Sequence, residues 1–140
     1  MTTAAMPRKI SSLPYMAHAQ VQWFKQLLEA QVAATELKTA TLKDTILDAP
    51  HESDDEVGRA TREEEIAKAR GLEQRYLEDA ASCRRALSAI ESGDYGYCAE
   101  TGEEIGLLRL QARPDALYCI AAQHRRERRA NQYAPQWAYA

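Results

Sequence analysis

Long apolar runs are missing from this 140-residue sequence. A helix that crosses a bilayer needs about 20 consecutive apolar residues, so we expect no transmembrane segment and no membrane partner. Residues 1–14 hold Arg8 and Lys9 but no apolar run of signal-peptide length. Cysteine is scarce, and three cysteines without a tight spacing do not make a disulfide framework. These absences predict a cytoplasmic protein.

An excess of positive charge is also missing. The 18 Lys and Arg residues stand against 21 Asp and Glu, which gives a formal net charge of −3. A general nucleic-acid binder would be clearly basic, and no helix-turn-helix or complete finger is present to contact DNA bases specifically. No nucleophile–base pair, phosphate loop or metal triad indicates an enzyme. We therefore expect a monomer without catalytic activity, whose partner is another protein.

Glycine and proline are absent from residues 17–47, where good helix formers dominate. Apolar side chains recur there at helical spacings, at Val21, Phe24, Leu28 and Val32, and again at Leu42 and Ile46. The segment predicts one helix of ~45 Å at ~1.5 Å per residue. A helix of that length needs a partner helix to cover its apolar stripe.

A second helix follows a short polar break. Pro50 ends the first helix, and Ser53 with Glu56 has the spacing of a capping box, which marks a new helix start. Gly93 ends the second helix near residue 92. The expected buried seam consists of Leu72, Tyr76, Ala80, Cys83, Leu87 and Ile90. Two long helices joined by a short turn predict an antiparallel coiled-coil hairpin over residues 17–92, with its tip near 49–60.

Shorter segments flank the hairpin. Residues 1–16 lack helical periodicity and are expected to form a flexible arm. Residues 93–133 predict a turn-rich, finger-like module with a last helix over about 116–131, and residues 134–140 an irregular tail. The predicted fold class is mainly α: a long antiparallel coiled-coil hairpin, a small zinc-finger-like globular module and a C-terminal helix.

The glycine-rich segment carries a specific motif. It reads Gly-Tyr-Cys-Ala-Glu-Thr-Gly-Glu-Glu-Ile-Gly over residues 96–106, followed by Arg109-Leu110, Ala112-Arg113-Pro114 and Cys119-Ile120. This pattern resembles the zinc-finger signature of the DksA/TraR family, and with the preceding hairpin the resemblance covers roughly residues 18–133. It implies a transcription regulator that inserts its hairpin into the secondary channel of bacterial RNA polymerase. The tip would then change the lifetime of promoter complexes, in many members together with the alarmone guanosine tetraphosphate (ppGpp).

The chain departs from the family pattern at the metal positions. Four thiolates in two Cys-x2-Cys pairs make a closed tetrahedral zinc site. The four positions here are Cys98, Thr101, Cys119 and Ala122. Thr101 is a poor zinc ligand and Ala122 is none, so we predict a metal-free knuckle that requires no cofactor and resembles the zinc-independent paralogues of the family. Two alternatives stay open: zinc held by the two cysteines with His124, or a redox pair of the same two cysteines.

The tip departs from the family pattern as well. The family motif Asp-x-x-Asp-x-Ala falls on residues 55–60, and Gly58 replaces the second Asp. The resemblance implies that the polymerase is contacted by Asp55, Glu56, Gly58, Arg59 and Ala60. Alternatively, the acids here only complement the positive end of the second helix.

The resemblance also implies polymerase or ppGpp contacts for Arg75, Arg109 and Arg113. Ser82 and Gln123 stand where relatives have lysine, so ppGpp is a candidate co-regulator and not a required one. Each of the three arginines is alternatively an ordinary solvated side chain. The second reading of the whole chain is a divergent member that acts as an adaptor or competitor without full activity, because Gly58 replaces the second tip acid.

Overall fold

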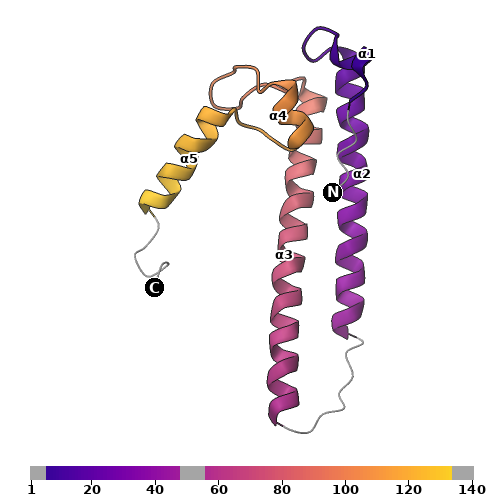
Figure 1. Ribbon diagram of the computed structural model, residues 1–140, viewed down its shortest axis with the longest axis vertical. Helices are drawn as coiled ribbons and strands as arrows, with labels where there is room; N and C mark the ends of the chain where they lie inside the picture. The colour runs from indigo at the N-terminus through magenta and orange to yellow at the C-terminus, as the bar shows by residue number, and fades with distance from the viewer. Residues whose placement is uncertain (1–5, 48–55, 134–140) are drawn as a thin grey trace.

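The computed structural model describes residues 6–47 and 56–133. The helices in these ranges are α1 (Arg8–Ser11), α2 (His18–Leu47), α3 (Glu56–Ser92), α4 (Leu107–Ala112) and α5 (Ile120–Tyr133). Helices α2 and α3 run antiparallel as a long hairpin, α4 lies beside one end of it, and α5 projects away (Figure 1). The mainly α architecture with a long hairpin is confirmed. Neither described range holds a helix that is both long and apolar enough to cross a membrane.

The bounds of the two long helices agree closely with the sequence prediction, because the helical pattern in each extends over many residues. Helix α2 begins one residue after the expected start, and α3 ends at Ser92 as expected. Gly93 follows with φ +83°, a left-handed conformation that glycine adopts without the steric cost of a Cβ atom. The capping residue proposed for α3, Ser53, lies outside the described residues.

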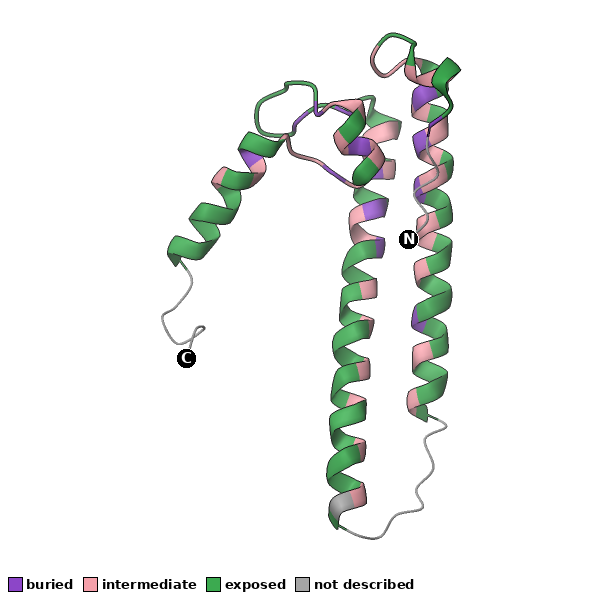
Figure 2. Cartoon of the chain, in the orientation of Figure 1, coloured by how far each residue is buried: buried purple, intermediate pink, exposed green. Residues whose placement is uncertain are grey.

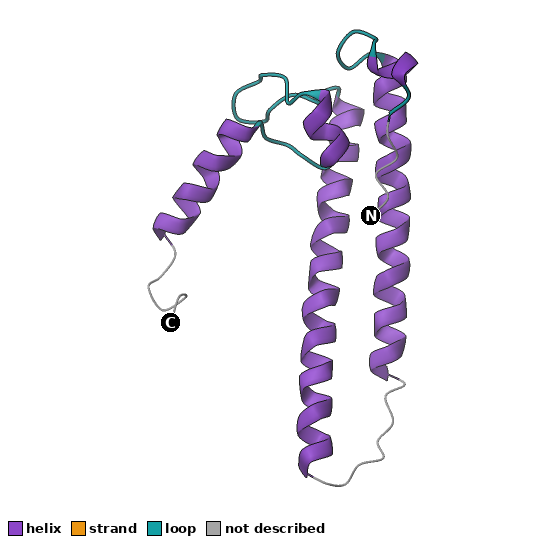
Figure 3. Cartoon of the chain, viewed as in Figure 1, coloured by secondary structure: helices purple, strands orange, loops and turns teal. Residues whose placement is uncertain are grey.

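The finger-like module differs from the prediction in its helices. Before α5, this module consists mostly of loops and turns (Figure 3), with an isolated antiparallel bridge between Tyr97 and Glu104. The short helix α4 was not predicted, because six residues are too few to show a helical period. The last helix begins at Ile120 and not at 116, because the backbone N–H of Ala116 closes a turn onto the carbonyl of Arg113.

The apolar core lies where the hairpin meets the finger-like module, at the end we call the base. Phe24 and Leu28 of α2 and Leu110 of α4 are fully buried. The ring of Tyr95, just after α3, lies 5.5 Å from that of Phe24. Burying each large apolar side chain contributes roughly 1.5–3 kcal/mol. Figure 2 shows the buried residues gathered at this end, while the rest of the hairpin is mostly exposed.

The seam between the two long helices shifts from the predicted register near its middle. Leu72 was expected to be buried and is 38% exposed. The less exposed positions of α3 in this region are Ala69, Glu73, Tyr76 and Ala80. Their alternating spacing of four and three keeps one face of α3 against α2, and Leu72 falls beside that face. The seam here includes an ion pair between Lys43 and Glu73 at 3.5 Å, so the hairpin away from the base is held by a more polar contact.

The predicted flexible arm over residues 1–16 is corrected from residue 6 onward. Met6 is 7% exposed, and residues 8–11 form α1. The side chain of Gln20, fully buried on α2, donates hydrogen bonds to the carbonyls of Ile10 at 2.9 Å and Leu13 at 3.2 Å. The segment is held by these polar contacts to α2 and by Met6, which belongs to the apolar core. A search for apolar periodicity does not detect such contacts.

Candidate functional site

The described part of the predicted tip is the N-terminal end of α3. It lies at the end of the hairpin opposite α4 (Figure 1). Glu56, Arg59 and Ala60 are exposed, and Gly58 is partly buried. Asp55 lies outside the described residues. Four of the five predicted tip residues therefore occupy the start of one helix, as far along the hairpin as the described chain extends.

The charge at this helix end is small. Glu56 is the acid of the first turn of α3, where a carboxylate interacts favourably with the positive end of the helix dipole. Arg59, in the same helix turn as Glu56, adds a positive charge. Gly58 offers no carboxylate and weakens the helix start by up to ~1 kcal/mol relative to alanine. The described tip is thus an exposed surface with one acid where the family motif would have added a second.

The knuckle, residues 96–106, is closed by backbone hydrogen bonds. The N–H of Cys98 donates to the carbonyl of Glu103 at 2.7 Å, and the N–H of Gly102 donates back to the carbonyl of Cys98 at 2.8 Å. The N–H of Ala99 donates to the carbonyl of Leu117 at 2.9 Å, which ties the knuckle to the segment before α5. These bonds give the loop a defined shape.

The first finger cysteine lies in a pocket of hydrogen-bond donors. Cys98 is 3% exposed. Burial raises the pKa of its thiol, but hydrogen bonds from the Thr101 hydroxyl and from the backbone N–H groups of Cys119, Glu100 and Thr101 stabilise the thiolate more strongly. Together they lower the pKa of Cys98 from 9.0 to about 6. The site therefore favours a thiolate at neutral pH.

The other three finger positions supply one more sulfur atom. Cys119 is a free, partly buried cysteine, and Thr101 is exposed, with its hydroxyl oxygen accepting from the N–H of Glu103 at 3.3 Å. Ala122 is fully buried and presents a methyl group. His124 on α5 is exposed.

This donor set does not fit a structural zinc ion. Such an ion takes four nitrogen, sulfur or oxygen ligands in a tetrahedron, and these positions offer two thiols, a hydroxyl and a methyl group. Across residues 6–47 and 56–133, His, Cys, Asp and Glu side chains do not gather in threes as a metal site would require. The metal-free knuckle stays a prediction, and the geometry gives zinc no complete shell.

Two tyrosines that the sequence reasoning missed hold the finger-like module in place. The hydroxyl of Tyr15 donates to the carbonyl of Gly96 at 2.5 Å and accepts from the N–H of Gly106 at 3.0 Å. The hydroxyl of Tyr95 donates to the carbonyl of Pro114 at 2.9 Å. The contact of Tyr15 with Gly96 could not be predicted from neighbouring residues, because the entire hairpin lies between the two in the sequence.

The three predicted basic contacts lie on two elements. Arg75 is exposed on α3. Arg109, on α4, is partly buried, and its Nε donates to the carbonyl of Tyr118 at 3.1 Å, so it also holds the loop before α5. Arg113 follows α4 and reaches Asp115 at 3.3 Å, with its side chain 64% exposed. Arg113 and Asp115 also line a groove of about 420 Å³ between this loop and the hairpin.

The two positions where the family resemblance implied lysine carry uncharged, paired side chains. The Ser82 hydroxyl accepts a hydrogen bond from Arg85 at 2.8 Å. The amide of Gln123 donates to Glu127 at 2.8 Å. A tetraphosphate needs several converging cations or backbone donors, and neither side chain adds a cation.

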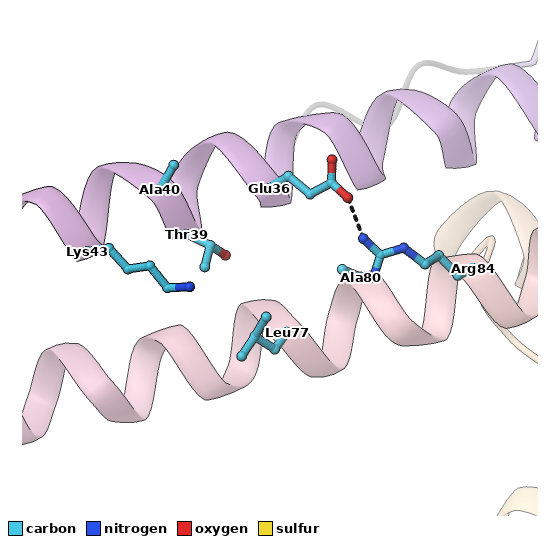
Figure 4. A pocket seen from close by; sticks show the side chains of 7 residues that line it. All are labelled: Glu36, Thr39, Ala40, Lys43, Leu77, Ala80 and Arg84. Atoms are coloured by element: carbon cyan, nitrogen blue, oxygen red, sulfur yellow. Dashed lines mark hydrogen bonds and ion pairs between the residues drawn. The ribbon is translucent and has the colours of Figure 1, made fainter.

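A second hollow, of about 210 Å³, lies between the two long helices (Figure 4). Small side chains, Thr39 and Ala40 on α2 and Ala80 on α3, leave this space open. The cations at its rim already have carboxylate partners: Arg84 pairs with Glu36, and Lys43 pairs with Glu73. The hollow is therefore a packing gap in the seam and not a prepared anion site.

Comparisons with known proteins agree with this geometry. A family model described as a prokaryotic dksA/traR C4-type zinc finger matches residues 93–128. The RNA polymerase-binding transcription factor DksA of Caulobacter vibrioides (strain NA1000 / CB15N) is 37% identical over 119 residues, which cover 83% of this chain and 82% of that protein. The chain belongs to the DksA/TraR family.

Other members of the DksA/TraR family match over a similar extent. DksA of Escherichia coli (strain K12) is 35% identical over 124 residues, covering 86% of this chain and 80% of the relative. The solved structure of transcription factor DksA2 from Pseudomonas aeruginosa superimposes with a TM-score of 0.77 at 34% identity, covering 88% of this chain and 97% of that one. The resemblance inferred from residues 96–120 is confirmed, and the mainly α hairpin fold is shared.

Proposed function

We propose that this protein is a transcription regulator that binds bacterial RNA polymerase through the secondary channel and modulates the stability of promoter complexes. The relatives that are 35–37% identical are named RNA polymerase-binding transcription factors. In this proposal the protein acts in the cytoplasm as a monomer, is not an enzyme and makes no base-specific contact with DNA.

The observation that carries the proposal is the shape of the hairpin. Helix α3 has 37 residues, which corresponds to ~55 Å at ~1.5 Å per residue. Its C-terminal end is packed into the core, whereas Glu56, Arg59 and Ala60 at its N-terminal end are exposed. A rod that is anchored at one end and exposed at the other suits insertion into a narrow channel, with residues 55–60 leading.

Basic residues near the base are proposed to hold the outside of the polymerase. Arg75 and Arg113 are exposed and available for an acidic surface. Arg109 is partly buried and bonded to Tyr118, so we assign it to positioning the loop as well as to contact. Replacing Arg75 or Arg113 with alanine should weaken polymerase binding more at low salt than at high salt.

The direct test is binding of the full-length protein to core RNA polymerase. We expect co-purification, and competition with a cleavage factor that uses the same channel. Asp55→Asn should reduce the effect on promoter complexes, while Leu37→Ala, at an exposed site on α2, serves as the matched control. Absence of polymerase binding, or binding that such a factor does not displace, would contradict the proposal.

A second candidate function is a divergent member that occupies the channel without full activity. Gly58 favours it, because this position lacks the second carboxylate of the family motif. Transcription in vitro from a ribosomal promoter separates the two functions when the natural protein is compared with Gly58→Asp. A gain of regulation in Gly58→Asp supports the competitor, and equal activity of the two proteins supports the full regulator.

The alarmone ppGpp is a candidate co-regulator whose effect we propose to be weak. Ser82 and Gln123 provide no positive charge where relatives have lysine. The double variant Ser82→Lys, Gln123→Lys should respond more strongly to ppGpp than the natural protein in the same transcription assay. A full response of the natural protein would contradict this part of the proposal.

A further inference from the structure

Positive charge is concentrated on α5, although the whole chain carries a formal net charge of −3. Four of the 18 Lys and Arg residues are arginines of this 14-residue helix, and Glu127 is its single acid. Helix α5 projects away from the hairpin (Figure 1) and is mostly exposed (Figure 2), with Ala122 as its buried residue. The charge therefore lies on a part of the molecule that a partner can reach.

Three of the arginines lie on one face of α5. Arg125, Arg128 and Arg129 are three and four positions apart, a spacing that makes side chains neighbours on a helix surface. Gln132 continues this face by one more turn. Glu127 lies on the opposite face, where its carboxylate accepts a hydrogen bond. We call these four residues, 125, 128, 129 and 132, the arginine face, and it contains no acid.

Contacts near the start of α5 hold the helix in place. Arg125 pairs with Glu100 of the knuckle at 3.0 Å, and the guanidinium of Arg126 lies 4.3 Å from the ring centre of Tyr118. The other two arginines of the helix are exposed, and neither forms an ion pair with any residue that the structure describes. The anchored end thus presents two arginines that a partner can bind.

The stability of the helix itself does not account for this cluster. Cations stabilise a helix through its negative end, and the effect falls off within the last turn. The last turn of α5 holds no basic residue. A helix that is polar all round can also rely on side-chain pairs along its length, and the pair that α5 forms is Gln123 with Glu127 at 2.8 Å. This pair uses none of the arginines.

The composition of this surface favours a phosphate backbone over an acidic protein. Protein interfaces are centred on apolar and aromatic side chains, with charges at the rim. Over residues 123–132, α5 has no apolar side chain larger than alanine. Phosphate oxygens are bound by the side chains that are present, arginine, asparagine and glutamine, and a guanidinium matches them with two parallel hydrogen bonds. Duplex DNA carries one phosphate charge per about 1.7 Å of its axis, so a short basic face meets several.

We propose that the arginine face contacts the phosphate backbone of double-stranded DNA, through Arg128 and Arg129 with Arg125 at the edge of the contact. Phosphate contacts carry no sequence information, which agrees with a regulator that makes no base-specific contact. The contact needs no polymerase, so this inference and the proposed function can fail independently of each other. On a polymerase that already holds promoter DNA, the raised local DNA concentration strengthens it.

The test measures binding of the full-length protein to a short fluorescein-labelled DNA duplex by fluorescence anisotropy, from low to physiological salt. The logarithm of the affinity should fall with the logarithm of the salt concentration, with a slope of about −0.9 for each phosphate contacted. The double variant Arg128→Gln, Arg129→Gln should bind several-fold more weakly at low salt, with a slope shallower by about 2. Arg8→Gln, Lys9→Gln, at exposed positions of α1, is the charge-matched control and should bind like the natural protein.

Further arms identify the partner. A duplex of unrelated sequence should bind with the same affinity, and a single-stranded RNA of the same length more weakly, because its phosphates are less dense. The double variant should bind DNA-free core polymerase like the natural protein. If it loses affinity for the polymerase and not for DNA, the arginine face meets an acidic protein surface and the proposal is overturned.

The proposal is also overturned if the natural protein does not bind the duplex at low salt, or if the double variant and the control variant lose the same affinity. Tighter binding to the RNA than to the duplex would reject the assignment to DNA. Glutamine is close to arginine in helix propensity, and far-ultraviolet circular dichroism checks that both double variants keep their helices.

Discussion

The hydroxyl of Tyr95 donates a 2.9 Å hydrogen bond to the backbone carbonyl of Pro114. Tyr95 is 3% exposed, and its ring also contacts Phe24. This single side chain therefore joins the end of α3, the start of α2 and the loop between α4 and α5. The finger-like module keeps its position on the hairpin through such contacts, because it is too small to form a separate core.

Tyr95→Phe should lower the free energy of unfolding by about 1–3 kcal/mol. The change keeps the ring and leaves a buried carbonyl without its donor, which costs about this much. Urea unfolding followed by circular dichroism measures the difference. Tyr97→Phe is the control, since Tyr97 is 40% exposed and the loss there should stay below about 0.5 kcal/mol. Equal effects of the two changes would contradict this role of Tyr95.

Phe24→Ala should be the most damaging single truncation on α2. Phe24 is fully buried between Trp23 and Tyr95, and removing a buried phenylalanine side chain costs about 3–5 kcal/mol. Leu37→Ala, on the same helix at 69% exposure, should cost less than about 0.5 kcal/mol. Thermal unfolding of both variants checks the contrast, and a similar midpoint for the two would place the core elsewhere.

Gly71→Ala should stabilise the hairpin. Gly71 lies inside α3 and is exposed, and a Cβ atom added there would meet no neighbouring atom within 4 Å. Alanine in a helix interior is better than glycine by about 0.5–1 kcal/mol. Denaturant unfolding should show a higher midpoint, with polymerase binding unchanged. Destabilisation would mean that glycine is needed at this position for a reason beyond helix propensity.

The stability of the metal-free protein should rise with pH between about 6 and 8.5 through Cys98. Its folded pKa of about 6 lies below the ordinary 9.0 because hydrogen bonds to the thiolate outweigh the cost of burial. Because the folded protein favours the Cys98 thiolate, this group stabilises the fold fully above pH 9, the pKa in the unfolded chain. The stabilisation is lost as the pH falls toward 6, where the thiol is protonated in the folded protein as well. Cys98→Ser should flatten the rise, and unfolding measured at several pH values tests this.

The pKa of Cys83 is shifted in the opposite direction from that of Cys98. Burial raises the pKa of its thiol to about 11, with Asp115 and Asp79 adding to the shift. Its neutral form is favoured in the folded protein, so its contribution decreases only as pH rises above 9. Cys83→Ser should leave the rise between pH 6 and 8.5 in place. If Cys83→Ser abolished the rise instead, the assignment to Cys98 would be wrong.

The long elements could be predicted from the sequence because their signal is repeated many times. Residues 17–47 contain neither glycine nor proline, and Gly93 stops α3 at the expected residue. The motif around Cys98 and Cys119 was specific enough to indicate the family. The seam register near Leu72 was not predictable from apolar residues alone, since the contact face there includes Glu73.

The contacts of the N-terminal segment could not be read from local sequence. Gln20 holds Ile10 and Leu13 by hydrogen bonds, and Tyr15 reaches Gly96 across the length of the chain. Such partners are chosen by the tertiary fold, and a polar side chain shows no periodicity that marks its partner. Helix α4 was missed for a related reason, because its formation depends on burying Leu110 in the core.

The uneven packing of the hairpin has a mechanical consequence. Buried side chains such as Phe24 and Leu28 hold the two helices together at the base. Farther along the hairpin, the helices are held by exposed and polar pairs such as Lys43 and Glu73. Backbone amide protons should therefore exchange with deuterium fastest at the start of α3 and progressively more slowly toward the base. If the hairpin enters a channel as proposed, its loosely packed far end would bend to fit the channel wall, while the tightly packed end that carries the knuckle keeps its shape.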